Sequence, residues 1–144
     1  MGRMNYARVL LGGLAAGVLV AVGEALLNGV LLKEDWAAAM SSLGKSPEMT
    51  VVQAVGYNLW ALLLGMSAVW FYAAIRPRFG PGPQTAACAG LAIWFVGYAL
   101  STAAALISEV LPARLLLIAV AWGLAEVLIA TLAGCWLYRE DAAT

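Results

Sequence analysis

Four long runs of apolar residues constrain the fold of this chain more than any other feature. They cover residues 9–32, 49–75, 86–111 and 114–138, and each is long enough to cross the roughly 30 Å hydrocarbon core of a bilayer as a helix. A helix also satisfies its own backbone hydrogen bonds, as a lipid environment requires. The pattern predicts an all-α, four-helix transmembrane bundle, built from two helical hairpins, as a single domain over residues 1–144.

The composition agrees with an integral membrane protein. Hydrophobic residues make up 64% of the 144 residues and charged residues 11%, whereas an average soluble domain has about 45–50% and about 25%. The formal net charge is zero, and no basic patch indicates a nucleic-acid partner. The chain has no histidine, which removes the commonest metal ligand and the commonest general base.

The remaining reactive side chains form no catalytic pattern. Cys88 and Cys135 lack a C-x-x-C spacing, and we expect both to be small buried hydrophobes. The hydroxyl residues of the apolar runs have no lysine or histidine base nearby, and the chain lacks the aspartate motifs of an intramembrane protease. We therefore expect no enzymatic activity, no metal site and no cofactor.

The longest connection, residues 33–48, carries mixed signals. Trp36, Met40 and Leu43 lie at helical spacing and predict a short amphipathic helix on the membrane surface, with a solvated loop as the alternative. Ser46, followed by proline and glutamate, is the predicted N-cap of the second span.

The second connection, residues 76–83, contains three prolines and two glycines and is the strongest predicted break. Pro112 marks a tight third connection. Counting lysines and arginines gives five on one side (Arg3, Arg8, Arg76, Arg78, Arg139) and three on the other (Lys33, Lys45, Arg114). The positive-inside rule then predicts that both chain ends are cytoplasmic.

Two glutamates lie inside the apolar runs, where a charged side chain costs on the order of 3 kcal/mol. Counting along the helices puts Glu126 near the midplane and Glu24 about 5 Å closer to the 33–48 side. If both face one interior, we expect at least one of them to be neutral at pH 7. They are either a proton- or cation-coupling pair, or neutral hydrogen-bonding groups that hold the helices in register.

Further polar residues are expected beside the two acids. Asn28 lies four residues after Glu24 and so shares its helix face, and Trp122 lies one turn before Glu126. The other candidates on the 33–48 side are Gln53, Tyr57, Asn58, Ser101 and Thr102. They either line a ligand site or bind neighbouring helices together. Likewise Trp60, Trp94 and Trp122 either line an aromatic cavity or pack in the bundle.

Small residues mark the expected helix contacts. Gly13-x-x-x-Gly17 is a close-packing motif, which serves either contacts within the chain or a homo-oligomer. Gly123 belongs to a similar stripe of small residues that includes Glu126.

Four short helices with a membrane-embedded glutamate on the first resemble the small multidrug resistance transporters. This chain is longer, and it has a second intramembrane glutamate and a longer first connection, so no binding residue is carried over. The chain is also similar to uncharacterised bacterial four-helix inner-membrane proteins, through its start at residues 5–8, its Gly/Ala-rich first run, Asn28-Gly29 and the Trp36 segment. That resemblance implies a multi-pass inner (plasma) membrane location and no particular activity.

Two functional hypotheses follow. The first is a small proton-coupled carrier or ligand-binding bundle that uses Glu24 and Glu126. The second is a non-catalytic accessory or assembly subunit of a membrane complex. The expected partners are the lipid bilayer and either a second copy or another membrane protein.

Overall fold

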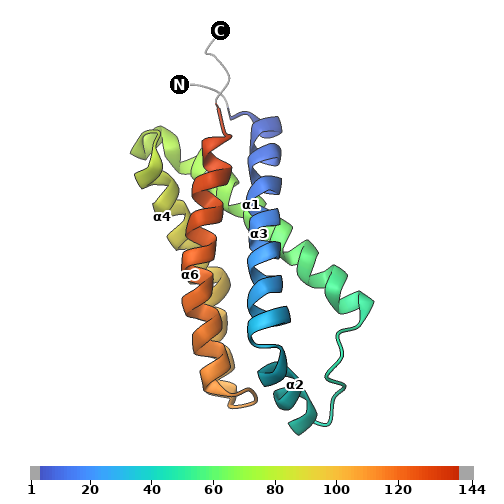
Figure 1. Cartoon of the computed structure of the whole chain (residues 1–144). Helices are drawn as coiled ribbons and strands as arrows, with labels where there is room; N and C mark the ends of the chain where they lie inside the picture. The colour runs from blue at the N-terminus through green and yellow to red at the C-terminus, as the bar shows by residue number, and fades with distance from the viewer. Residues whose placement is uncertain (1–3, 140–144) are drawn as a thin grey trace.

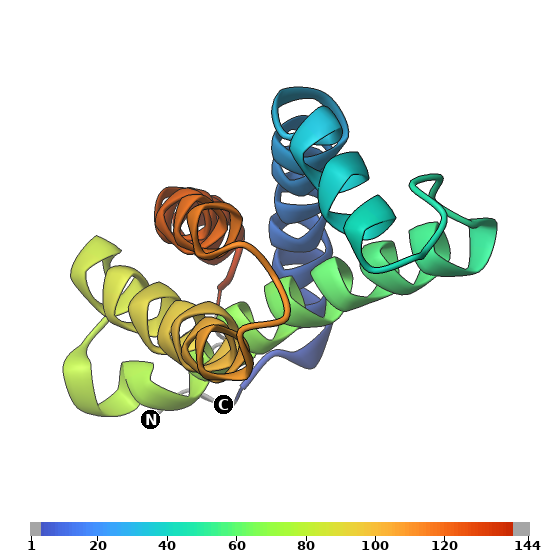
Figure 2. The same ribbon diagram turned by 90° about the horizontal axis from the view of Figure 1, so that it is seen from below.

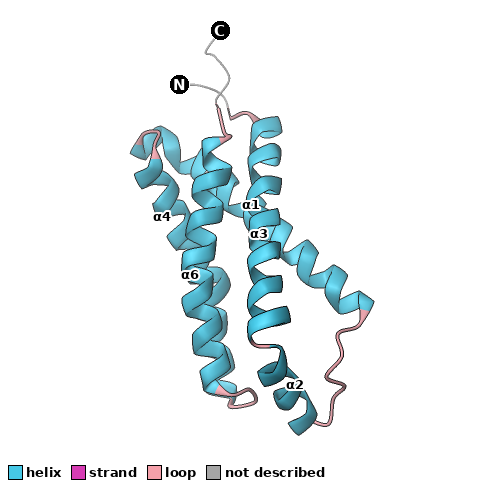
Figure 3. Ribbon diagram, in the orientation of Figure 1, coloured by secondary structure: helices cyan, strands magenta, loops and turns pink. Residues whose placement is uncertain are grey.

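Helices form all of the regular structure in residues 4–139, the part of the chain that the computed structural model describes (Figures 1 and 3). The helices are α1 (Tyr6–Leu26), continued by the π-helical turn η1 (Leu27–Leu31); α2 (Lys33–Ser42); α3 (Val51–Phe79); α4 (Pro83–Trp94), continued by the π-helical turn η2 (Phe95–Ala99) and α5 (Leu100–Ser108); and α6 (Ala113–Trp136). Four segments are long and apolar enough to cross a membrane: Tyr6–Leu31, Val51–Phe79, Pro83–Ser108 and Ala113–Trp136. The predicted all-α membrane protein with four spans is confirmed.

The spans form a bundle with two different ends. In Figure 1, α1 and α6 run side by side, α3 crosses behind α1, and α4 lies beside α6. The start of α1 and the end of α6 share one end of the bundle, called here the terminal end. The short helix α2 and the turn between α5 and α6 lie at the opposite end, called here the α2 end (Figures 1 and 2).

Glycines bring the helices into backbone contact in the terminal half. A Cβ added to Gly65 of α3 would lie 2.5 Å from the Cα of Gly17 and 2.6 Å from the carbonyl oxygen of Gly13. A Cβ on Gly134 of α6 would lie 2.5 Å from the carbonyl oxygen of Gly12. The Gly13-x-x-x-Gly17 motif is therefore used inside the chain, at the crossing of α1 and α3.

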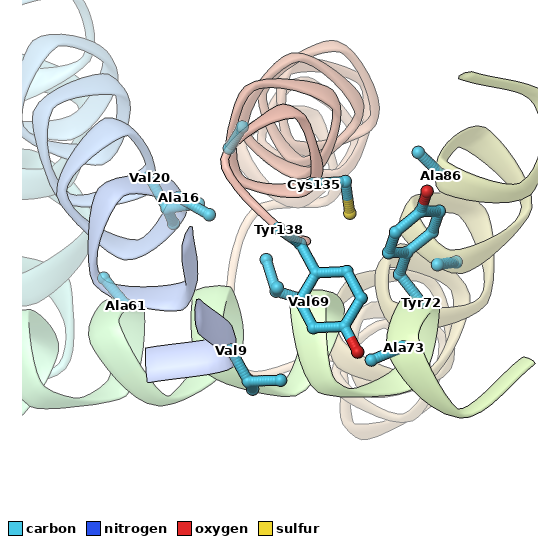
Figure 4. Packing of buried hydrophobic residues seen from close by; sticks show 12 residues of the cluster. Val9, Ala16, Val20, Ala61, Val69, Tyr72, Ala73, Ala86, Cys135 and Tyr138 are labelled. Atoms are coloured by element: carbon cyan, nitrogen blue, oxygen red, sulfur yellow. The ribbon is translucent and has the colours of Figure 1, made fainter. Parts of the chain in front are cut away.

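Small and β-branched side chains fill the space between these helices. Figure 4 shows this core, in which the rings of Tyr72 and Tyr138 pack edge to face with centroids 5.9 Å apart. Cys135 is buried here as expected, but Cys88 is exposed on α4, so its predicted burial is wrong. The core comprises Val9, Ala16, Val20, Ala61, Val69, Tyr72, Ala73, Ala86, Ala89, Ala130, Cys135 and Tyr138.

The α2 end is more open than the terminal end. The first half of α3 runs away from the other spans (Figures 1 and 2). Its side chains are exposed on every side; Val52 is 81% exposed and Tyr57 62%. A smaller buried cluster, made of Leu27, Leu32, Ala39 and Leu115, lies beneath α2.

The helix ends differ from the predictions at two places. Thr50, and not Ser46, is the N-cap of α3, because Thr50 and Gln53 form a reciprocal capping box. The 76–83 segment does not break the helix at its start: α3 continues through Pro77 and ends at Phe79. Pro77 removes one backbone hydrogen bond of the last turn, and the chain leaves the helix three residues later at Gly80, whose φ is 83°.

Candidate functional site

Glu24 and Glu126 meet inside the bundle, next to Tyr98. The hydroxyl of Tyr98, in η2, donates to Oε1 of Glu24 at 2.5 Å and also faces the carboxyl group of Glu126. The Glu126 carboxyl lies directly against α1: a Cβ added to Gly23 would be 2.5 Å from Glu126 Oε2. Three spans thus bring two acids and a phenol together.

A chain of hydrogen bonds leads from α2 to Glu24. The side-chain amide of Asn28 donates to Oε2 of Glu24 at 2.5 Å and to the Glu24 carbonyl oxygen at 3.2 Å. The indole Nε1 of Trp36, on α2, donates to Asn28 Oδ1 at 2.8 Å. Both carboxyl oxygens of Glu24 therefore accept a hydrogen bond, and Asn28 connects the acid to the surface helix.

Glu126 is less completely paired. Its Oε2 accepts a hydrogen bond from the indole Nε1 of Trp122 at 2.7 Å. Its Oε1 is buried and has no hydrogen-bond partner among the described residues, and the whole residue is only 9% exposed. A buried carboxylate oxygen without a donor is costly. Glu126 Oε1 is therefore the carboxyl oxygen of the site whose negative charge is least compensated.

Both π-helical turns lie at the site. Asn28 lies in η1 and Tyr98 in η2, and such turns rotate the following side chains relative to a regular α-helix. A π-turn also leaves carbonyl groups without their usual partners. Ser101 compensates for this in the third span, since its hydroxyl donates to the carbonyl oxygens of Gly97 at 2.6 Å and Tyr98 at 3.0 Å.

Gly123 supplies the surface on which Tyr98 rests. A Cβ added to Gly123 would lie 2.6 Å from both Cδ1 and Cε1 of the Tyr98 ring. This residue was expected to pack against another helix, and the contact with Tyr98 shows which helix and which side chain it contacts. The absence of a side chain at this position lets the phenol reach both acids.

Several sequence candidates lie away from the acids. Gln53 caps the start of α3, as described above, and Tyr57 is 62% exposed. Asn58 is exposed, and its amide donates to the carbonyl oxygen of Ala54 on its own helix at 2.8 Å. Gln53, Tyr57 and Asn58 do not join the site because the first half of α3 diverges from the bundle.

The remaining candidates support the site or the packing. Ser101 stabilises the π-turn that carries Tyr98, and Thr102 is half-buried on α5. Trp60 contacts Tyr98 edge to face, with ring centroids 5.4 Å apart. Trp94 links α4 to α6 through a hydrogen bond to the Val120 carbonyl oxygen at 2.9 Å. The tryptophans thus make three different contacts: Trp60 with Tyr98, Trp94 with α6, and Trp122 with Glu126.

Sequence reasoning missed Tyr98 and did not foresee the contact of Trp36 with Asn28. A tyrosine in the middle of an apolar run was the available signal for Tyr98, because a buried hydroxyl needs a partner. Trp36 was expected at the membrane surface because tryptophan is typical of the headgroup layer. The predicted helix is present, but Trp36 is directed toward Asn28 on the bundle side of α2.

The site is built from groups that donate and accept hydrogen bonds. The described residues contain no group of three or more His, Cys, Asp or Glu side chains that could hold a metal ion. The groups that converge are two carboxyls, one phenol, one amide and two indoles, each of which can donate or accept hydrogen bonds.

The fold and the site together define a polytopic α-helical membrane protein with a hydrogen-bonded pair of acids inside its bundle. Comparison with protein-family models, with curated proteins and with solved structures finds no match for this chain. The two resemblances described above therefore remain predictions.

Proposed function

We propose that this protein is a small proton-coupled membrane carrier in which Glu24 and Glu126 bind and release the coupled proton. One observation carries the proposal. The buried Oε1 of Glu126 lacks a hydrogen-bond donor and lies in the same site as a second carboxyl group. A proton on Glu126 removes a buried negative charge and the repulsion between the two acids.

Tyr98 gives the pair a means of sharing that proton. Its hydroxyl donates to Glu24 and faces Glu126, so a small rotation of the Tyr98 side chain changes which of the two carboxyl groups accepts its hydrogen bond. Binding of a solute or loss of a proton on one side then alters the hydrogen bonds of three spans at once. That coupling between the site and the helices is what a carrier requires.

The test measures proton binding directly. The purified protein in lipid nanodiscs is titrated with pH, and tryptophan fluorescence is recorded. Trp122 donates to Glu126, so its emission reports that carboxyl, and Trp122→Phe identifies its share of the signal. We expect a titration that Glu126→Gln abolishes and Glu24→Gln shifts or abolishes.

The control is Glu109→Gln, which removes an exposed acid at the end of α5 and leaves the titration unchanged. A flat profile in the wild type, with both site variants at least as stable as the wild type, would show that the acids are neutral packing groups. The carrier proposal would then be abandoned.

The second candidate function is an accessory or assembly subunit. The first half of α3 favours it, because this segment leaves the bundle and exposes the polar amide of Asn58 within a membrane span. Purification of the native protein in mild detergent discriminates between the two. A stable hetero-complex supports a subunit, and a homo-oligomer or monomer with a proton titration supports the carrier.

The sidedness is also proposed. The terminal end carries Arg8, Arg76, Arg78 and Arg139 and the α2 end carries Lys33, Lys45 and Arg114, while Arg3 lies outside the described residues. The excess of arginine supports a cytoplasmic terminal end in an inner (plasma) membrane, with α2 on the outer side. Labelling of single introduced cysteines at the two ends with an impermeant reagent in intact cells tests this.

A further inference from the structure

The short helix α2 packs against the ends of α1 and α6 and is hydrogen-bonded to the site through Asn28. It folds back against the end of α1, in Figure 1 at the foot of the bundle and in Figure 2 nearest the viewer. Ala39 and Leu32 are 5% and 6% exposed, and they pack with Leu27 of η1 and Leu115 of α6. Ala119 and Trp122 of α6 pack against the same cluster, so α2 lies over the part of α6 that leads to Glu126.

Two polar contacts hold α2 in place. The first is the hydrogen bond from Trp36 to Asn28, which in turn binds Glu24. The second is an ion pair at 3.2 Å between Asp35 of α2 and Arg114 of α6. Their side chains are 41% and 71% exposed, so this second contact is weak.

The backbone departs from the helical conformation on both sides of α2. At Leu32 the chain leaves the helical conformation, with φ of −110° and ψ of 14°, between η1 and α2. Beyond α2, Gly44 has a positive φ of 67°, and the connection to α3 is exposed throughout. The backbone on either side therefore leaves α2 free to move as a unit, and the contacts that oppose this movement are the apolar cluster beneath α2 and the two polar contacts.

We infer that α2 is a lid that opens and closes access from its end of the bundle to the Glu24 and Glu126 pair. In the closed position Trp36 fixes Asn28, and Asn28 covers Oε2 of Glu24. When α2 lifts, the side-chain oxygen of Asn28 loses the hydrogen bond from Trp36, and the Asn28 side chain is free to rotate away from Glu24. That the lid controls the access of protons rests on the proposed function, whereas the movement of α2 does not.

The movement is tested by the accessibility of a thiol placed beneath the lid. Ala119→Cys, in a Cys88→Ala/Cys135→Ala background, is reacted with a charged, membrane-impermeant thiol reagent. Trp36→Phe keeps the ring packing but removes the hydrogen bond, and we expect labelling about fivefold faster, which corresponds to about 1 kcal/mol. Asp35→Asn should accelerate it by less than about twofold.

Trp70→Phe is the matched control, because Trp70 is exposed on α3 far from α2, and it should leave the labelling rate unchanged. Equal rates for Trp36→Phe and the control would overturn the lid. So would fast labelling of Ala119→Cys in the presence of Trp36, at the rate of an exposed cysteine.

The gating role is tested by locking the lid. In the cysteine-free background, Asp35→Cys and Arg114→Cys are joined by a short, reducible thiol cross-linker, with each single variant as control. The titratable groups facing the pair of acids are each other and Tyr98, while Asp35 and Arg114 lie at the lid. We expect the Trp122 response to a pH jump applied at the α2 side to become at least about tenfold slower, since the hydrogen-bonded closed state is then the only one available, and to recover on reduction.

The two proposals fail in different ways. A normal pH response in the cross-linked protein would overturn the lid and leave the carrier in place. Absence of any pH response, with labelling still accelerated by Trp36→Phe, would overturn the carrier and confirm that α2 moves.

Discussion

Replacement of Gly123 by alanine tests the central contact of the site. The added Cβ would lie 2.6 Å from two atoms of the Tyr98 ring, about 1 Å closer than carbon atoms normally approach. Overpacking of this kind costs about 1–3 kcal/mol, whereas alanine favours the helix by about 0.5–1 kcal/mol. We therefore expect a net loss of stability of up to about 2.5 kcal/mol.

The ring also has to move away from the acids. Its hydroxyl donates to Glu24 at 2.5 Å, a length that a displacement of the ring does not preserve. Because hydrogen bonds to charged or ionisable groups contribute about 1.5–3 kcal/mol, Gly123→Ala should also shift the pH response of Trp122. Tyr98→Phe should produce a similar shift without the steric cost.

The assay is reversible unfolding in mixed detergent micelles, followed by tryptophan fluorescence, together with the pH titration in nanodiscs. Gly56→Ala is the control: an added Cβ there meets nothing within 4 Å, so it should leave the titration unchanged and be neutral or slightly stabilising. The shift caused by Gly123→Ala should largely disappear in a Tyr98→Phe background. Wild-type stability and titration in Gly123→Ala would refute the placement of Tyr98 on α6.

Three further predictions concern the acids and the helices. Glu24→Gln should destabilise the fold by about 1–3 kcal/mol in the same unfolding assay, because both oxygens of Glu24 accept hydrogen bonds and the amide group of glutamine would present a donor to either Asn28 or Tyr98. Glu126→Gln should be neutral or stabilising. A larger loss of stability for Glu126→Gln than for Glu24→Gln would contradict the assigned hydrogen bonds. Gly65→Ala should cost at least about 1–3 kcal/mol, since backbone atoms of α1 cannot give way as a flexible side chain can; a stable variant would argue against the close crossing of α1 and α3. Thr50→Ala should lower the free energy of unfolding by about 1 kcal/mol, and Ser46→Ala should leave it almost unchanged. Equal losses in the two variants would support Ser46 as the N-cap of α3.

The four spans were predictable because their signal is local. Each run of apolar residues reports its preference for lipid without reference to the rest of the chain. The same local contrast identified Glu24 and Glu126, because a carboxyl group in such a run stands out. Asn28 and Trp122 followed from their distance along the helix to each acid, and the structure confirms both contacts.

The errors arose where the arrangement depends on distant parts of the chain. Asn58 and Tyr57 have the same polar character as Asn28, but the first half of α3 diverges from the bundle and takes them away from the acids. Tyr98 joins the site because a π-turn rotates it and Gly123 leaves room for its ring. Neither effect is visible in the sequence around Tyr98.

The sequence by itself determined that this is an all-α membrane protein with four spans and two acids at membrane depth, because hydrophobicity over a span-length window decides partition into lipid. Only the tertiary structure decided which polar residues meet the acids and that α2 turns Trp36 toward them. The reason is physical: in a bilayer every face of a helix is tolerated, so hydrophobicity does not specify how each helix is rotated. Close contacts at glycines, two π-turns and a few hydrogen bonds between spans specify it.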